Sequence, residues 1–131
     1  MRGSGTVLLV EDEDIVRRPI GTYLRKLGYQ VIEAANGNQA IALWRDHRDE
    51  IDLLYTDMVM PVGVTGLELA ERLVMEKPTL RIIISSGYST EFSAHGVTTE
   101  AGFIYLPKPS ASAIIASTVR SCIEQKKAVE A

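Results

Sequence analysis

The chain has 131 residues, of which 46% are hydrophobic and 24% are charged, as in ordinary globular domains. This length and composition predict one compact domain and argue against a disordered chain or a coiled coil. The net charge of −3 disfavours nucleic acid as a direct ligand, because proteins that bind the phosphate backbone usually carry a basic patch.

The sequence shows neither an apolar run of membrane-spanning length nor the apolar core of a signal peptide. We therefore expect no membrane insertion and a cytoplasmic location, and the single Cys122 fits a reducing compartment. We expect residues 1–5 to be a flexible N-terminus or a cloning remnant, residues 6–128 to be the domain, and residues 129–131 to be a short tail.

Short apolar runs rich in strand-forming residues alternate with stretches whose apolar residues repeat at helical spacing. Asp14 is predicted to cap the first helix and Gly28 to end it, while Pro19 should kink or delay its first turns. The alternation predicts an α/β fold with a parallel five-stranded sheet covered by helices on both faces. The predicted strands are 6–10, 30–34, 51–56, 81–85 and 103–106, and the predicted helices are 15–27, one that carries 40–44, 66–75, 88–101 and 112–128.

Polar residues stand at or just beyond the ends of four of the five predicted strands. Asp57 ends an apolar run that Pro61 prevents from continuing as strand or helix. Because ligands in open parallel sheets bind beyond the carboxyl ends of the strands, these polar residues should share one edge. They are Glu11, Asp12, Asp57, Ser85 and Lys108.

Three carboxylates in one place repel one another unless a cation compensates them. Carboxylate and carbonyl oxygens suit Mg²⁺, and neither His47 nor His95 is placed to form a zinc site. A lysine and a hydroxyl beside such a metal complement a phosphoryl group, and an ionised Asp57 is a competent nucleophile for an aspartyl-phosphate.

These segments resemble the receiver domains of response regulators in two-component signalling. The resemblance covers the chain from Thr6 to the last helix. The sequence is also similar to those of receiver domains in hybrid sensor histidine kinases. It implies a flavodoxin-like (βα)5 three-layer sandwich with strand order 2-1-3-4-5. Four segments carry the resemblance: the acidic pair Glu11-Asp12, T-D-M-V-M-P around Asp57, S-S-G-Y from Ser85, and Y-L-P-K-P from Tyr105 through Lys108.

The resemblance implies a metal site beside a phosphoacceptor. Asp57 would accept the phosphoryl group, and Mg²⁺ or Mn²⁺ would be bound by Asp12, by Glu11 through water, by the Asp57 carboxylate and by the backbone carbonyl of Val59. Glu11 stands where many members of the family have a second Asp, which lengthens one arm of the site.

The resemblance also implies groups that contact and sense the phosphate. Lys108 would pair with the phosphoryl oxygens and Ser85 would donate a hydrogen bond to them, while Tyr105 would turn inward as Ser85 moves. The bond from Lys108 to the next proline resembles one that is cis in the family. Ser110 follows where an aromatic residue is common, which predicts altered packing under the last helix.

The implied partner is a histidine kinase or a histidine phosphotransfer protein, with a receiver dimer as a further candidate. We expect no enzymatic activity beyond Mg²⁺-dependent self-phosphorylation and autodephosphorylation of Asp57. A phosphorylated domain would switch conformation and signal to a partner or an output domain.

Other interpretations stay open at this point. A haloacid-dehalogenase-type phosphohydrolase also uses an Asp after a strand, but it needs a second Asp where Val59 stands. A flavin-binding protein shares the architecture, but the acidic residues 11–14 would repel its phosphate. A degenerate receiver would act as an interaction module alone. Taken singly, Asp57 could be a turn residue, Lys108 a solvated lysine and Tyr105 a core aromatic, and Ser86 could replace Ser85 as the donor.

Overall fold

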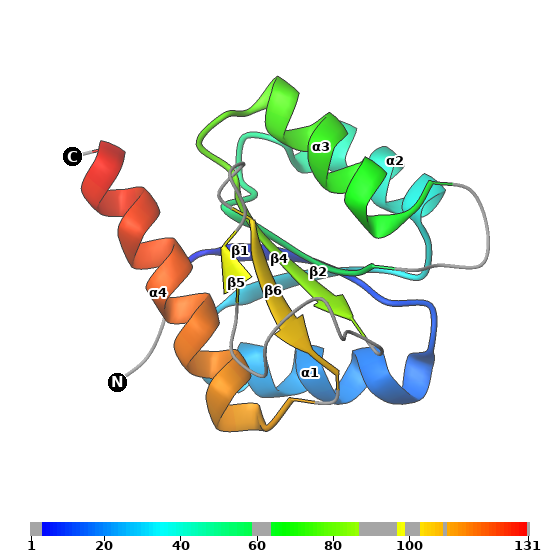
Figure 1. Cartoon of the computed structure of the whole chain (residues 1–131), viewed down its shortest axis with the longest axis vertical. Coiled ribbons are helices and arrows are strands. Elements are labelled where there is room, and N and C mark those ends of the chain that lie inside the picture. Colours follow the sequence, from blue (N-terminus) through cyan, green and yellow to red (C-terminus); the bar gives the residue numbers. More distant parts are fainter. Residues whose placement is uncertain (1–3, 59–63, 87–96, 99–102, 109, 131) are drawn as a thin grey trace.

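Figure 1 shows the computed structural model, which describes residues 4–58, 64–86, 97–98, 103–108 and 110–130. Within these residues six strands form one sheet in the order β2-β1-β3-β4-β6-β5. The strands are β1 (Thr6–Val10), β2 (Gln30–Ala34), β3 (Leu53–Asp57), β4 (Arg81–Ser86), β5 (Val97–Thr98) and β6 (Ile104–Pro107). The helices are α1 (Asp14–Lys26), α2 (Gly37–His47), α3 (Gly66–Glu76) and α4 (Ser112–Glu130).

The five predicted strands are parallel neighbours in the predicted order, so the flavodoxin-like fold is confirmed. The two-residue strand β5 was not predicted and pairs antiparallel with β6 at the edge of the sheet. It falls within residues 88–101, the least periodic part of the sequence, where we predict a helix, so that prediction is wrong for Val97–Thr98. The remainder of the segment lies outside the described residues.

The sheet is the middle of three layers (Figure 1). Alternate residues of each strand point to opposite faces, so Leu8 and Val10 pack toward α2 and α3, while Val7 and Leu9 pack toward α1 and α4. Because both faces are covered, β1, β3 and β4 are apolar over most of their length and carry their polar residues at or near the strand ends. Trp44, 1% exposed, fills the layer under α2 and α3.

The helix ends are set by local hydrogen bonds. Asn36 caps α2 by accepting from the Gln39 backbone N–H, and Thr65 forms a capping box with Glu68 at the start of α3. The predicted cap at Asp14 is wrong, because α1 begins at that residue and its carboxylate pairs with Arg17.

The first helix otherwise follows its sequence signals at its C-terminal end. Gly28, just past α1, has a φ of 107°, a conformation that glycine adopts without strain. Pro19 lies inside α1, which runs unbroken from Asp14, so the proline does not delay the helix start.

The strand order reverses direction between β1 and β3, since the chain adds β2 on one side of β1 and the remaining strands on the other. In such sheets the crevice at the carboxyl ends of the two central strands is where ligands bind.

No helix among the described residues has the length and apolarity needed to cross a membrane.

Candidate functional site

Three carboxylates meet at the carboxyl ends of β1 and β3. Glu11 and Asp12 follow β1 directly and Asp57 is the last residue of β3. Their carboxylate oxygens lie within 4.8 Å of one another. Glu11 and Asp57 are 4% and 9% exposed, so this negative charge is held in a largely buried place.

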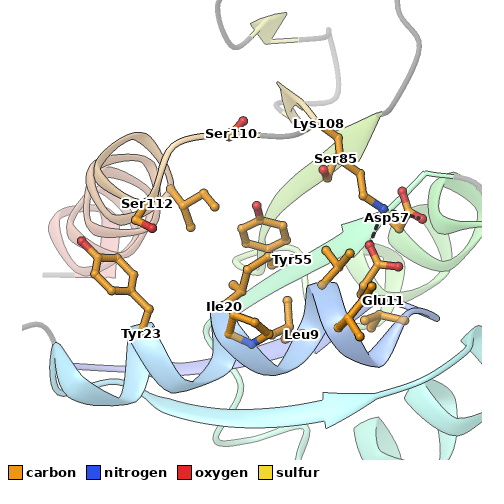
Figure 2. A pocket seen from close by; sticks show the side chains of 15 residues that line it. Leu9, Glu11, Ile20, Tyr23, Tyr55, Asp57, Ser85, Lys108, Ser110 and Ser112 are labelled. Carbon is orange, nitrogen blue, oxygen red and sulfur yellow. Dashed lines mark hydrogen bonds and ion pairs between the residues drawn. The ribbon is translucent and has the colours of Figure 1, made fainter.

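Lys108 reaches into this cluster from the end of β6 (Figure 2). Its Nζ lies 2.5 Å from Glu11 Oε1 and 3.5 Å from Asp57 Oδ2. Its backbone N–H donates to the Ser86 carbonyl at 2.8 Å, which ties the end of β6 to the end of β4. The lysine is therefore a positioned charge at the crevice and not a solvated loop residue.

The two serines at the end of β4 have different neighbours. Ser85 is in register with Asp57, and both line the same cavity on the α1–α4 side. Ser86 follows Ile84 by two residues, so it faces the α2–α3 layer, where Tyr105 is buried with 5% exposure. The structure thus separates Ser85 from Tyr105 by the sheet and places Ser86 on the face of Tyr105.

Burial and charge perturb all three groups that meet at Lys108. Burial raises the pKa of Asp57, and the Asp12 carboxylate adds to this while the Lys108 ammonium opposes it. Burial likewise raises the pKa of Glu11, and the hydrogen bond from Lys108 partly opposes this rise. Burial disfavours the ammonium of Lys108, but the Glu11 and Asp57 carboxylates outweigh it and raise the pKa of Lys108. The raised carboxyl pKa values mean that pairing with the ammonium does not fully offset the cost of burying the carboxylates.

The donor set fits a hard divalent cation. The cluster consists of carboxylate oxygens, which Mg²⁺ and Mn²⁺ prefer, and its excess negative charge is what a cation would neutralise. Glu11, Asp12 and Asp57 are the residues that could hold the ion. The predicted ligand Val59 lies outside the described residues, as does Pro109 with its predicted cis bond.

Arg17 is a site residue that the sequence reasoning missed. Its side chain is 9% exposed, its Nη1 donates to the Glu11 carbonyl at 2.7 Å, and its Nε donates to Glu33 Oε1 at 3.1 Å. One guanidinium thus ties the start of the acidic loop to α1 and β2. The available signal was spacing, because Arg17 precedes the inward-facing Ile20 by three residues and Leu24 by seven.

Replacing Arg17 with methionine should cost roughly 3 kcal/mol in the free energy of unfolding, because Glu33 and Asp14 lose their buried partner and Glu33 keeps only the more exposed Arg25. It should also weaken Mg²⁺ binding, since the Glu11 carbonyl loses its donor. Urea unfolding with and without Mg²⁺ measures both effects. The control is Arg18→Met. The Arg18 side chain is 72% exposed and forms a weak surface ion pair with Asp14 at 3.8 Å, so its loss should change stability little. Equal losses in the two variants would contradict the role given to Arg17.

Gly66 brings the start of α3 against the end of β3. Its N–H donates to the Met58 carbonyl at 2.9 Å, and a Cβ built on it would lie 1.8 Å from the Asp57 carbonyl oxygen. No side chain fits at that distance, so this position requires glycine for its close approach. The sequence placed the start of this helix near Gly66 without indicating this contact.

A family model for the response regulator receiver domain matches residues 7–120. The chain belongs to this family. Receiver domains are signalling modules of two-component systems and are generally not enzymes.

Solved structures agree with this assignment. The receiver domain of the hybrid histidine kinase CckA is 34% identical, with a TM-score of 0.77 over 91% of this chain and 99% of that chain. A receiver domain protein from Clostridium thermocellum is 22% identical, with a TM-score of 0.83 over 95% and 98% of the two chains, and supports the fold alone.

A curated relative extends the likeness to a longer protein. Sensor kinase CckA of Brucella abortus is 37% identical over 126 residues, which are 96% of this chain and 13% of that kinase. The chain therefore matches one receiver domain within a much larger relative.

Proposed function

We propose that this receiver domain accepts a phosphoryl group on Asp57 from a histidine kinase or a histidine phosphotransfer protein. The observation that carries the proposal is the position of Asp57, whose carboxylate lies within 4.8 Å of two others and 3.5 Å from Lys108 in the crevice of the sheet. Burying a carboxylate beside two others costs free energy of folding. A role of Asp57 in phosphotransfer would explain why the chain carries that cost.

In the proposed reaction an Asp57 carboxylate oxygen attacks the phosphorus atom of a phosphohistidine or an acyl phosphate. The new O–P bond forms as the bond to the donor breaks, and the electron pair leaves with the donor's nitrogen or oxygen. Mg²⁺ bound by Glu11, Asp12 and Asp57 would supply positive charge to the phosphoryl oxygens. Lys108 would exchange part of its pairing with Glu11 for the new phosphoryl charge.

The proposed hydroxyl donor to the phosphoryl group is Ser85, because it shares the cavity of Asp57. Ser86 is the alternative, and it is the serine that shares the face of Tyr105. We infer that phosphorylation shifts a two-state equilibrium in the segment from β4 to β6, which contains both serines and Tyr105.

Ser85→Ala should slow phosphorylation by acetyl phosphate about tenfold, the effect of losing one hydrogen bond to a charged group. Ser86→Ala is the matched variant and should leave this rate within a factor of about two. Rates are measured by intact mass over time. A larger effect of Ser86→Ala would assign the phosphate contact to Ser86 instead.

The proposal as a whole is tested by incubating the protein with acetyl phosphate and Mg²⁺ and weighing it intact. We expect a gain of one phosphoryl group, and no gain in EDTA. Absence of any gain with Mg²⁺ would favour the alternative, a degenerate receiver that acts only as an interaction module. Multiple turnover of a phosphate ester would instead indicate a hydrolase.

Metal binding has its own test. Mg²⁺ at about ten times its dissociation constant should raise the free energy of unfolding by roughly 1.4 kcal/mol, because it binds the folded state alone. Asp12→Asn should lose most of this gain, whereas Asp46→Asn, on the exposed side of α2, should keep it. Urea titrations at several Mg²⁺ concentrations measure the gain. Full Mg²⁺ stabilisation of Asp12→Asn would contradict the proposed ligand set.

We further propose a cytoplasmic location, which the free and buried thiol of Cys122 supports. The similarity to CckA supports an origin as the receiver of a hybrid sensor kinase. Activity would then consist of self-phosphorylation and slow autodephosphorylation of Asp57, with signalling to a partner or output domain.

A further inference from the structure

A cavity of about 370 Å³ opens between α1 and α4 and runs from the phosphoacceptor site along the sheet (Figure 2). Its walls are mainly apolar and include Val16, Pro19 and Ile20 of α1 and Ile115 of α4. Asp57 and Lys108 stand at one end, and Tyr23 and Ser112 at the other (Figure 2). The volume lies in the range of small-molecule sites, which are concave and mostly apolar with a few polar groups.

The cavity is open because the residues that lead into α4 are small. Ser110 lies at its rim, and its hydroxyl turns back to donate to the Pro107 carbonyl instead of filling the space. Ser112, the first residue of α4, is also small and lines the same wall. An aromatic side chain at position 110 would occupy the volume that serine leaves.

Tyr55 places an unused polar group in this cavity. The residue is 4% exposed, and its ring stands between α1 and α4 with the hydroxyl directed away from α1 (Figure 2). Within the described part of the chain, the Tyr55 hydroxyl has no hydrogen-bond partner. A phenol hydroxyl carries its proton at neutral pH, so the Tyr55 hydroxyl is able to donate a hydrogen bond. Because Tyr55 lines the cavity, its hydroxyl offers a hydrogen bond to an atom of a molecule that enters it.

We propose that this cavity binds a small, neutral aromatic molecule that carries one hydrogen-bonding group for the Tyr55 hydroxyl. The apolar walls favour a flat apolar body, and a charged ligand would lose its hydration without a free counter-charge, because Lys108 is already paired with Glu11. Ligand binding in this cavity does not require phosphorylation of Asp57. The proposed phosphorylation and the proposed ligand site can therefore be tested independently.

Indole is a suitable probe, because it is flat, neutral and has one N–H group. Titrated into protein with ¹³C-labelled isoleucine methyl groups, it should shift the signals of Ile20 and Ile115 saturably. Ile82 and Ile84, which face the other layer of the sheet, should not move. Tyr55→Phe should weaken binding about fivefold, the effect of one neutral hydrogen bond.

Ser110→Phe should abolish the shifts by filling the cavity, while Thr79→Phe, at an exposed turn at the other end of β4, should leave them unchanged. If Ser110→Phe fails to fold, Val16→Phe fills the same space from α1. Shifts that do not saturate, that persist in the filled variant, or that are confined to the exposed Ile114, which lies outside the cavity lining, would overturn the proposal. If Tyr55→Phe bound indole as tightly as the parent chain, the hydrogen bond assigned to the Tyr55 hydroxyl would be contradicted.

Discussion

Replacing Asp57 with asparagine should lower phosphate incorporation from acetyl phosphate by roughly a hundredfold or more, because an amide oxygen is a poor nucleophile and cannot replace the carboxylate. Intact mass after incubation with Mg²⁺ measures the loss. The control is Asp49→Asn, which removes an exposed carboxylate after α2 and should incorporate phosphate like the parent chain. Undiminished incorporation in Asp57→Asn would place the phosphoryl group elsewhere.

The same substitution should stabilise the metal-free protein at neutral pH. The pKa of Asp57 is raised in the folded chain, so the folded state binds its proton more tightly than the unfolded state does. The parent chain therefore loses stability as pH rises through the raised pKa, and asparagine avoids that loss. Below the ordinary aspartate range both states are protonated and the advantage should vanish.

This pH dependence is checked by urea unfolding of both proteins in EDTA between acidic and neutral pH. The two unfolding curves should separate as pH rises. Added Mg²⁺ should narrow the difference, because it stabilises the parent chain through the carboxylates that asparagine disrupts. A difference that is largest at acidic pH would have the opposite sign and would contradict the electrostatic explanation.

Replacing Gly66 with alanine should reduce the free energy of unfolding by about 3 kcal/mol or more, because the added Cβ would overlap the Asp57 carbonyl oxygen. Backbone atoms on both sides of the contact cannot rotate away as a side chain would. The relief has to come from moving the start of α3 or the end of β3. Phosphorylation by acetyl phosphate should therefore also slow, since Asp57 moves with its strand.

Gly21→Ala is the matched control. A Cβ at Gly21, inside α1, would approach the end of the Glu33 side chain at 2.9 Å, and that end shifts more easily than backbone, although its ion pairs with Arg17 and Arg25 oppose the shift. Because alanine also favours a helix interior over glycine by roughly 0.5–1 kcal/mol, this variant should lose much less stability than Gly66→Ala. Circular dichroism of both variants in urea provides the comparison. If the two variants had similar stabilities, α3 would tolerate displacement from β3, and the large cost predicted for Gly66→Ala would be wrong.

Much of the fold is readable from local signals. Four of the five parallel strands, all except β2, are short apolar runs that stop at a charged, polar or proline residue, so their positions and carboxyl ends are visible in the residues themselves. The gathering of Glu11, Asp12, Asp57, Ser85 and Lys108 at one edge then follows from the parallel arrangement, because equivalent strand ends meet. The segment 88–101 shows the limit, since two residues of it pair with β6 through contacts that periodicity does not encode.

The resemblance and the strand ends by themselves determined that Asp57 lies in an acidic crevice beside a lysine. Tertiary structure alone decided which groups support it: Arg17 under the Glu11 carbonyl, Gly66 against the Asp57 carbonyl, and the opposite faces taken by Ser85 and Tyr105. The physical reason is that hydrophobic pattern and turn chemistry act between near neighbours in the chain. A close backbone approach or a cavity beside Tyr55 depends instead on how separately formed layers pack.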